Sequence, residues 1–346
     1  MTISMFARRK HFADHLAPIW FAIPEDHRGD FWVPAYIESD VRAMGINCSI
    51  ARGVARGHGS YLKVDPGGSD PILCAAYDDM ERAFRANKDR WLGLMEHGCG
   101  LAFSEHSHGY PGGQGLRRRV GLFLSPNEFI RAKTAHGLPK AKQVVIGTPK
   151  LDAWVDRRNE FIPGEVIDGK PTVAVSFHWN GERVCPEAGN AWRWYVDALP
   201  SLTKTYHMLG HGHPKILRFL APYYEAMGFE VVEDFNEVAR RACVYVNDCS
   251  STLYEFCVTG KPVVILNAPW FDKKRDYGIR FWKYTDIGPQ VEHSAGLKAA
   301  IDTSVKSGTE YYAEARSRAI SELYPNLGTS ARIAADALLK WIVDCK

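Results

Sequence analysis

The stretch that decides the fold is Tyr245-Val246-Asn247-Asp248-Cys249-Ser250-Ser251-Thr252. Its apolar start predicts a buried β-strand, and three hydroxyl side chains follow where a helix is predicted to begin. The N-terminus of a helix has N–H groups without helical partners and a partial positive charge, and serine and threonine hydroxyls add further donors for an anion. Plain N-capping by Ser250 or Ser251 explains the same residues. The stretch therefore predicts either an ordinary cap or a site that holds a phosphate.

Short apolar runs alternate with helical periodicity on both sides of this stretch, which is typical of an α/β fold. In the C-terminal half, we expect strands at 172–177, 205–209, 230–232, 244–247 and 262–266, and helices at 192–199, 216–227 and 236–242. In the N-terminal half, we expect strands at 71–76, 91–95, 121–125 and 144–146, and helices at 78–86 and 127–134. The sequence thus predicts two consecutive doubly wound parallel sheets.

A polar segment at 157–170, rich in turn formers, separates the two patterns and predicts a linker. We therefore expect one domain over residues 1–160 and a second over residues 171–346. Apolar residues repeat at helical spacing from 330 to 343, with Thr329 or Ser330 as the N-cap, and this last helix is expected to pack back. Ligands of such sheets bind beyond the carboxyl ends of the strands, so we expect the site in a cleft between the two halves.

Composition limits the class of protein. The chain has 346 residues, of which 46% are hydrophobic and 24% charged. Its net charge of +3 gives no strong field, so an affinity for nucleic acid cannot be inferred from composition alone. Arg117-Arg118-Arg119 is a dense basic run, which solvent exposure alone also explains. The eight cysteines form no C-x-x-C pair and no run of about 18 apolar residues occurs, so we expect free thiols, a cytoplasmic protein and at most peripheral membrane contact.

Several short motifs, taken together, resemble a known family. Asp248-Cys249-Ser250-Ser251, Glu255-Phe256 and Gly260-Lys261-Pro262-Val263-Val264 resemble the signature of the CDP-glycerol:poly(glycerophosphate) glycerophosphotransferases, the teichoic-acid polymerases. Further motifs of that family occur in the same order as Glu96-His97-Gly98, Gly147-Thr148-Pro149-Lys150-Leu151-Asp152, His213-Pro214 and Gly288-Pro289. The resemblance implies a GT-B fold, in which two Rossmann-like domains face each other across a cleft. Cys249 replaces the family's tyrosine and Glu96 its tryptophan, so the transferred group and the acceptor stay open.

The resemblance also implies roles for individual residues. His97 would be the general base, with Glu96 beside it, and His213 would donate to the phosphate or the leaving oxygen, where positive charge stabilises the transition state. The residues expected to bind the donor's diphosphate and nucleotide are Asp248, Ser250, Ser251, Thr252, Glu255, His178 and Lys274. A glycine-rich stretch with His108, Gly109, Gly112 and Gly113 is expected to form a lid on the acceptor side. Histidine clusters around 106–108 and 207–213 also allow a metal site, but no complete ligand spacing is present, so we expect no metal.

The function expected from the sequence is therefore a metal-independent GT-B transferase without a cofactor. It would move a glycosyl or glycerophosphoryl group from a nucleotide-diphosphate donor, CDP- or UDP-linked, to the hydroxyl of a polymer, glycan, protein or modified-DNA acceptor. Two alternatives stay open. One is an isomerase like the UDP-sugar 2-epimerases, and the other is a degenerate GT-B protein that binds without catalysis.

Overall fold

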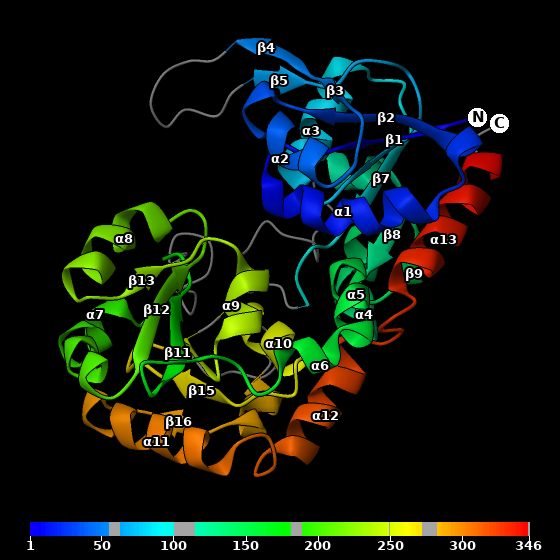
Figure 1. Ribbon diagram of the computed structural model, residues 1–346. Helices are drawn as coiled ribbons and strands as arrows, with labels where there is room; N and C mark the ends of the chain where they lie inside the picture. The colour runs from blue at the N-terminus through cyan, green and yellow to red at the C-terminus, as the bar shows by residue number, and fades with distance from the viewer. Residues whose placement is uncertain (55–62, 100–114, 181–188, 249, 272–281, 345–346) are drawn as a thin grey trace. The chain divides into compact units, whose positions relative to one another are not determined.

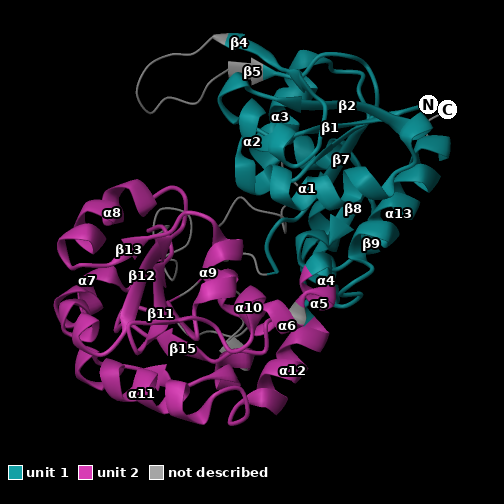
Figure 2. Ribbon diagram, in the orientation of Figure 1, with its two compact units in different colours: residues 1–99, 108–153, 323–346 teal, residues 100–107, 154–322 magenta. Residues whose placement is uncertain are grey.

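The computed structural model describes residues 1–54, 63–99, 115–180, 189–248, 250–271 and 282–344 (Figure 1). These residues form two compact units, each built around its own parallel sheet (Figure 2). Unit 1 contains the chain up to Cys99, continues to Ala153 and resumes at Leu323, whereas unit 2 runs from Trp154 to Glu322. The α/β class predicted from the sequence is confirmed, and the last helix packs back on the N-terminal unit.

The sheet of unit 1 has seven parallel strands in the order β3-β2-β1-β6-β7-β8-β9. Their bounds are β1 Ile3–Phe6, β2 Arg28–Val33, β3 Cys48–Ile50, β6 Ile72–Cys74, β7 Leu92–Met95, β8 Val120–Ser125 and β9 Lys142–Val145. A small antiparallel pair, β4 Arg52–Val54 and β5 Lys63–Asp65, forms a separate ribbon. Strands β1 to β3 precede residue 71, where the sequence pattern predicted none.

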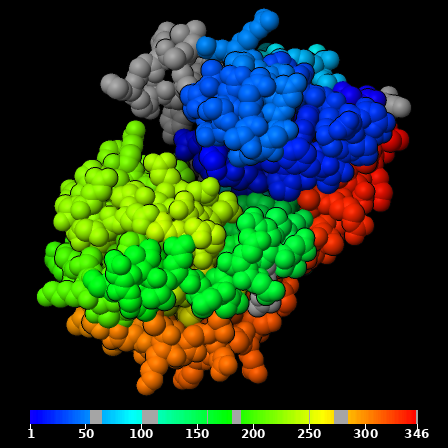
Figure 3. All heavy atoms as spheres, in the orientation of Figure 1, coloured from blue at the N-terminus to red at the C-terminus, as the bar shows by residue number. Residues whose placement is uncertain are grey.

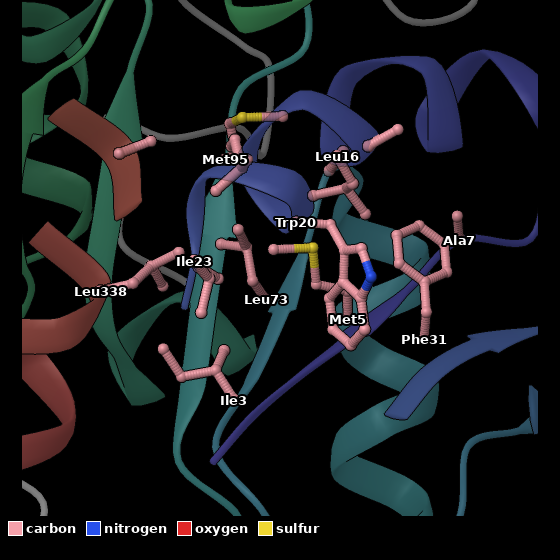
Figure 4. Close-up of a cluster of buried hydrophobic side chains, with 14 of the residues drawn as sticks. Ile3, Met5, Ala7, Leu16, Trp20, Ile23, Phe31, Leu73, Met95 and Leu338 are labelled. Carbon is pink, nitrogen blue, oxygen red and sulfur yellow. The ribbon is translucent and has the colours of Figure 1, made fainter. Parts of the chain in front are cut away.

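One face of this sheet is covered by α1 Lys10–Ala22, α2 Glu38–Ala43 and the C-terminal helix α13 Ser330–Asp344; α3 Tyr77–Ala86 and α4 Glu128–Thr134 complete the unit. Figure 4 shows the core beneath the first face, where Leu16 and Trp20 of α1 meet strand residues such as Met5 and Leu73. Leu338 of α13 joins the same cluster, and in Figure 3 the C-terminal helix lies against the first residues of the chain. Burial of this apolar face is what fixes α13 to unit 1.

The N-terminus of α13 is capped by a residue that lies far from the helix in the sequence, in place of the predicted cap. Asp152 accepts the backbone N–H of Gly328 at 2.9 Å and that of Ala331 at 2.7 Å, at the start of the helix. The hydroxyls of Thr329 and Ser330, expected to cap the helix, donate instead to the carbonyl oxygen of Asn326. The motif at 147–152 therefore attaches the C-terminal helix.

The sheet of unit 2 runs β13-β12-β11-β14-β15-β16, all parallel, with β10 antiparallel to β11. The bounds are β10 Val166–Ile167, β11 Lys170–Phe177, β12 His207–Gly212, β13 Glu230–Val231, β14 Val244–Asn247, β15 Val263–Leu266 and β16 Gln290–Val291. The helices α7 Trp192–Tyr195, α8 Leu217–Ala226 and α11 Leu297–Ser307 pack on one face. The others are α5 Asp152–Asp156, α6 Arg158–Phe161, α9 Phe235–Arg241, α10 Thr252–Cys257 and α12 Ala313–Leu323.

The segment expected to be a linker is structured. Residues 157–170 contain α6 and β10, and the boundary between the units lies before them, between Ala153 and Trp154. Glu165 binds Arg240 at 2.7 Å and Arg241 at 2.8 Å, which ties the segment to α9. Asp168 and Gly169, two of the turn formers that indicated a linker, instead connect β10 to β11 in a short antiparallel pair. In the part of the chain that the structure describes, no helix has the length and apolar character needed to cross a bilayer.

Candidate functional site

Most of the predicted donor-side residues lie at the carboxyl edge of the unit 2 sheet. β11 lies near its centre, with β12 on one side and β14 on the other, so the winding direction of the sheet reverses between β11 and β14. Loops that leave the strands at such a point diverge, and this leaves room for a ligand. His178 follows β11, His213 follows β12 and Asp248 follows β14. The residues predicted from the sequence therefore lie at the position where doubly wound sheets bind ligands.

Asp248 lies buried at this edge of the sheet, with 1% of its surface exposed. Its Oδ1 accepts the backbone N–H of His178 at 2.9 Å, and its Oδ2 accepts the N–H of Ala191 at 2.9 Å. Hydrogen bonds to a charged acceptor are roughly twice as strong as neutral ones. A carboxylate would also repel a diphosphate. Asp248 therefore fastens β11 and the start of α7 to β14, and the direct donor contact expected from the sequence stays a prediction.

The turn after β14 uses backbone N–H groups that the sequence analysis expected to be available to a phosphate. Ser250 donates its N–H to Oδ1 of Asn247 at 3.0 Å, and Thr252 donates its N–H to Oγ of Ser250 at 3.3 Å. The Ser251 side chain makes no cap hydrogen bond. A hydroxyl that accepts one hydrogen bond still has its own proton to donate. The turn therefore offers the Ser250 hydroxyl to a ligand in place of the amides of these two residues.

Three further residues were predicted to bind the donor: Thr252, Glu255 and Lys274. The hydroxyl of Thr252 lies 2.8 Å from the hydroxyl of Tyr245, and the two share a hydrogen bond. Glu255 is 2% exposed, so it is not a surface carboxylate of α10. Lys274 lies outside the described residues.

Two histidines and a tryptophan lie together just after the ends of β11 and β12. The rings of His178 and His213 are 5.2 Å apart and nearly perpendicular, and the ring of Trp179 lies 6.2 Å from that of His213. Lys215 places its ammonium group 4.0 Å from the Trp179 ring centre, within the range of a cation–π contact. The ends of β11 and β12 thus carry a group of cationic and N–H donor side chains, suited to an anionic ligand.

The tautomer of His213 follows from its backbone neighbour. The N–H of Lys215 donates to Nδ1 of His213 at 3.1 Å, so Nδ1 is the acceptor. In a neutral imidazole the other nitrogen then carries the proton. His213 in this arrangement has an Nε2–H donor, and its expected role towards the phosphate or the leaving oxygen stays a prediction.

His97 of unit 1 has the reverse arrangement. It follows β7 directly, and its Nδ1 lies 2.8 Å from the carbonyl oxygen of Ala75 and 3.5 Å from Oε1 of Glu96. Both neighbours are acceptors, so Nδ1 carries the proton and Nε2 is the basic nitrogen. The side chain of His97 is 40% exposed and that of Glu96 8%. Glu96, expected beside His97, lies within ion-pair distance of the ring.

Helix α1 surrounds His97 with three rings that the sequence analysis did not select. The ring centres of Phe12, His15 and His11 lie 4.9, 6.0 and 6.2 Å from that of His97. His15 is buried, and desolvation, with Lys150 and the two other histidines nearby, lowers its pKa well below the usual value, so its ring is neutral. The spacing His11-x-x-x-His15, which puts both rings on one helix face, was the available signal.

The remaining candidates contribute less. His108, Gly109, Gly112 and Gly113, predicted to form a lid, lie outside the described residues. In the basic run, Arg117 stacks 4.0 Å from the Tyr77 ring and Arg119 lies 5.5 Å from the Phe84 ring, so two of its three cations pack on α3. Among the residues that the structure describes, no group of three or more His, Cys, Asp or Glu side chains is placed to hold a metal ion.

Known proteins resemble this chain in structure but not detectably in sequence. No model of a protein family matches it, and no curated protein matches it by sequence. A structure of the wall teichoic acid polymerase TagF soaked with CDPG matches over 99% of this chain and 89% of its own, with a TM-score of 0.68 and 13% identity. UDP-GlcNAc 2-epimerase from Neisseria meningitidis bound to UDP-GlcNAc matches over 98% and 100%, with a TM-score of 0.61 and 14% identity.

A third similar structure is that of MnaA from S. aureus with UDP, at a TM-score of 0.58 and 14% identity, covering 100% of this chain and 98% of that protein. The similar structures share two parallel-sheet units with surrounding helices, and the likeness extends over the whole chain. The resemblance inferred from the sequence motifs is therefore supported by structure, and the chain has the GT-B fold.

Proposed function

We propose that the protein binds a nucleoside-diphosphate donor at the carboxyl edge of unit 2 and transfers its glycosyl or glycerophosphoryl group to an acceptor hydroxyl. The observation that carries the proposal is the convergence of His178, His213 and Ser250 on the ends of three adjacent strands at the reversal point of the sheet. The GT-B likeness to structures that contain CDPG, UDP or UDP-GlcNAc supports the choice of ligand class.

The donor-side groups suit a phosphate that gains negative charge as the bond to the transferred group breaks. Nε2–H of His213 would donate a hydrogen bond to that phosphate. The Ser250 hydroxyl adds a donor, and Lys215, held on Trp179, adds positive charge nearby. Fixed donors aimed at an oxygen on which charge develops are worth about 10²- to 10³-fold in rate each. Unit 2 would thus supply both binding and leaving-group stabilisation.

In this proposal His97 of unit 1 is the general base. Its Nδ1–H is held by Ala75, so Nε2 has the lone pair that removes the proton from the acceptor hydroxyl. The imidazolium formed in this step is stabilised by Glu96, 3.5 Å from Nδ1. The oxygen that loses its proton forms the new bond to the transferred group. In glycosyl transfer the bond between the sugar carbon and the diphosphate breaks and the nucleoside diphosphate leaves, whereas in glycerophosphoryl transfer the bond between the two phosphates breaks and the nucleoside monophosphate leaves.

An isomerase acting on a UDP-sugar is the second candidate. The N. meningitidis 2-epimerase is matched over its entire length, and Glu96 supplies a buried carboxylate beside a histidine, which is a reasonable acid–base pair for moving a proton at a sugar carbon. That chemistry would need carboxylates poised at C2 of the sugar, and no convincing pair of carboxylates stands out in the sequence. We therefore rank it below transfer.

Two measurements test the proposal in order. Titration calorimetry with CDP, UDP, GDP and ADP should give binding by at least one, and binding by none would refute a nucleotide site in unit 2. The wild-type protein is then incubated with CDP-glycerol and UDP-GlcNAc and followed by NMR. Release of nucleotide that depends on an added polyol acceptor indicates transfer, whereas a new UDP-linked 2-epimer with no acceptor indicates isomerisation. Binding without turnover of either donor would favour the non-catalytic alternative.

A further inference from the structure

Asn247, the last residue of β14, connects three parts of unit 2 through one amide group. Its Nδ2 donates to the carbonyl oxygen of Ser176 on β11 at 3.2 Å and to the hydroxyl of Tyr245 at 3.3 Å, while its Oδ1 accepts the N–H of Ser250 at 3.0 Å. The side chain is 0% exposed, so each of these bonds replaces one that water would otherwise make. Only a group with both donors and an acceptor in one plane satisfies all three neighbours.

Tyr245 secures the other end of the same turn. Residues two apart on a strand point to the same face, so Tyr245 and Asn247 lie side by side beneath the start of α10. The Tyr245 hydroxyl is hydrogen-bonded to Oγ1 of Thr252 at 2.8 Å, and its ring stacks on Phe256 with ring centres 5.0 Å apart. β14 therefore holds the turn at Ser250 and again at Thr252.

We propose that Asn247 is the positioning residue of the donor site, with Tyr245 as its support. Neither side chain contacts the ligand, since both are buried. Asn247 holds the backbone N–H of Ser250 and Tyr245 holds the side chain of Thr252, so that the turn is ordered before the nucleotide arrives. A site that is already ordered loses less conformational freedom on binding and so binds more tightly. This inference rests on the proposed function, in which the turn binds the donor.

The chain provides a matched control. Asn267 is also 0% exposed and directly follows the neighbouring strand β15. Its Nδ2 donates to Oε1 of Gln290 at 3.2 Å and to Oε1 of Glu292 at 2.8 Å, so it too makes partly buried hydrogen bonds to an adjacent strand and loop. Asn267→Leu should therefore destabilise unit 2 to a degree comparable with Asn247→Leu without releasing the turn at Ser250.

The experiment compares Asn247→Leu, Asn267→Leu and the milder Tyr245→Phe with the wild-type protein. Calorimetry with CDP and UDP gives the Kd, and hydrogen exchange by NMR gives the protection of the Ser250 amide. We expect Asn247→Leu to raise the Kd of the bound nucleotide about tenfold and to speed Ser250 exchange, because the turn loses its order. Asn267→Leu should lower the thermal midpoint but leave Kd and exchange at wild-type values, and Tyr245→Phe should raise the Kd about threefold.

A wild-type Kd in Asn247→Leu, or an equal rise in both asparagine variants, would overturn the positioning role. If Asn247→Leu does not fold, the same comparison is made with Tyr245→Phe, which preserves the ring, and an unchanged Kd there counts against the inference. Absence of nucleotide binding by the wild-type protein would refute the proposed function instead. In that case an unchanged exchange rate of the Ser250 amide would show separately that Asn247 does not hold the turn.

Discussion

Replacing Asp248 distinguishes a supporting carboxylate from one that contacts the donor. In Asp248→Ala the N–H groups of His178 and Ala191 lose the two acceptors that hold them at 2.9 Å. A hydrogen bond to a charged group contributes about 1.5–3 kcal/mol, so we expect unit 2 to lose about 3–6 kcal/mol of unfolding free energy. That is a large share of the roughly 5–15 kcal/mol that stabilises an ordinary domain. Asp248→Asn keeps one acceptor oxygen and should lose about half as much.

Hydrogen exchange followed by mass spectrometry is the suitable assay, because it reports stability locally and does not require the two units to unfold together. Peptides that contain β11 and β14 should lose protection in Asp248→Ala. The exposed carboxylate Asp197 provides the control, and Asp197→Ala should stay within about 0.5 kcal/mol of the wild-type value. If Asp248→Ala lost less than about 1 kcal/mol of protection while abolishing nucleotide binding, the carboxylate would serve the ligand, and the supporting role would be wrong.

Three further predictions follow from single contacts. His97→Gln should reduce transfer about 10²- to 10⁴-fold, measured as acceptor-dependent nucleotide release, while leaving the donor Kd unchanged; equal turnover would refute the base assignment. Asp152→Ala should cost about 1–2 kcal/mol by removing the cap of α13, seen as faster exchange in that helix alone. Burial lowers the pKa of Lys261 to about 7. The unfolded chain therefore binds more protons between pH 7 and 10.5, so stability rises with pH over that window, and urea unfolding of Lys261→Met should lack this rise.

The strands that were predictable from the sequence are those with a clear apolar run between turn signals. β11 and β14 are such runs, and both were placed within a residue or two of their observed bounds. β1, Ile3–Phe6, was missed because Ser4 interrupts its apolar run and because it precedes a helix with an internal proline, Pro18, and two histidines. Local pattern is weak in such a segment. Its place in the sheet is determined by burial against α1 and α13, which no short window of sequence contains.

The candidate site was partly predictable for a related reason. His178, His213 and His97 follow strong strand patterns, so their placement at the carboxyl edges followed from the fold. The hydrogen bonds of these side chains could not be predicted from the strand patterns. The tautomer of His213 depends on the backbone N–H of Lys215, and that of His97 depends on the carbonyl oxygen of Ala75. His11 and His15 were missed because α1 itself was not predicted.

The motifs that indicated the fold turn out to be mainly structural. Gly147 has φ +89° and lies against the backbone of Pro325, so any side chain there would displace the segment that leads into α13. Gly288 lies equally close to the carbonyl oxygen of Val263. Asp152 caps α13, and Asp248 fastens the strand ends of unit 2. These requirements come from the backbone of two wound sheets and are the same whatever ligand is bound.

This explains why a chain with only 13–14% identity to the similar structures still has recognisable motifs. Residues that satisfy buried backbone groups, or that leave room for them, cannot change without losing several kcal/mol, whereas residues that face a ligand change with the ligand. Motifs of the first kind predict the fold well and the substrate poorly. The identity of the donor should therefore depend on the side chains beside the motifs, such as His178, Trp179 and Lys215, and these are the positions at which ligand specificity is best tested.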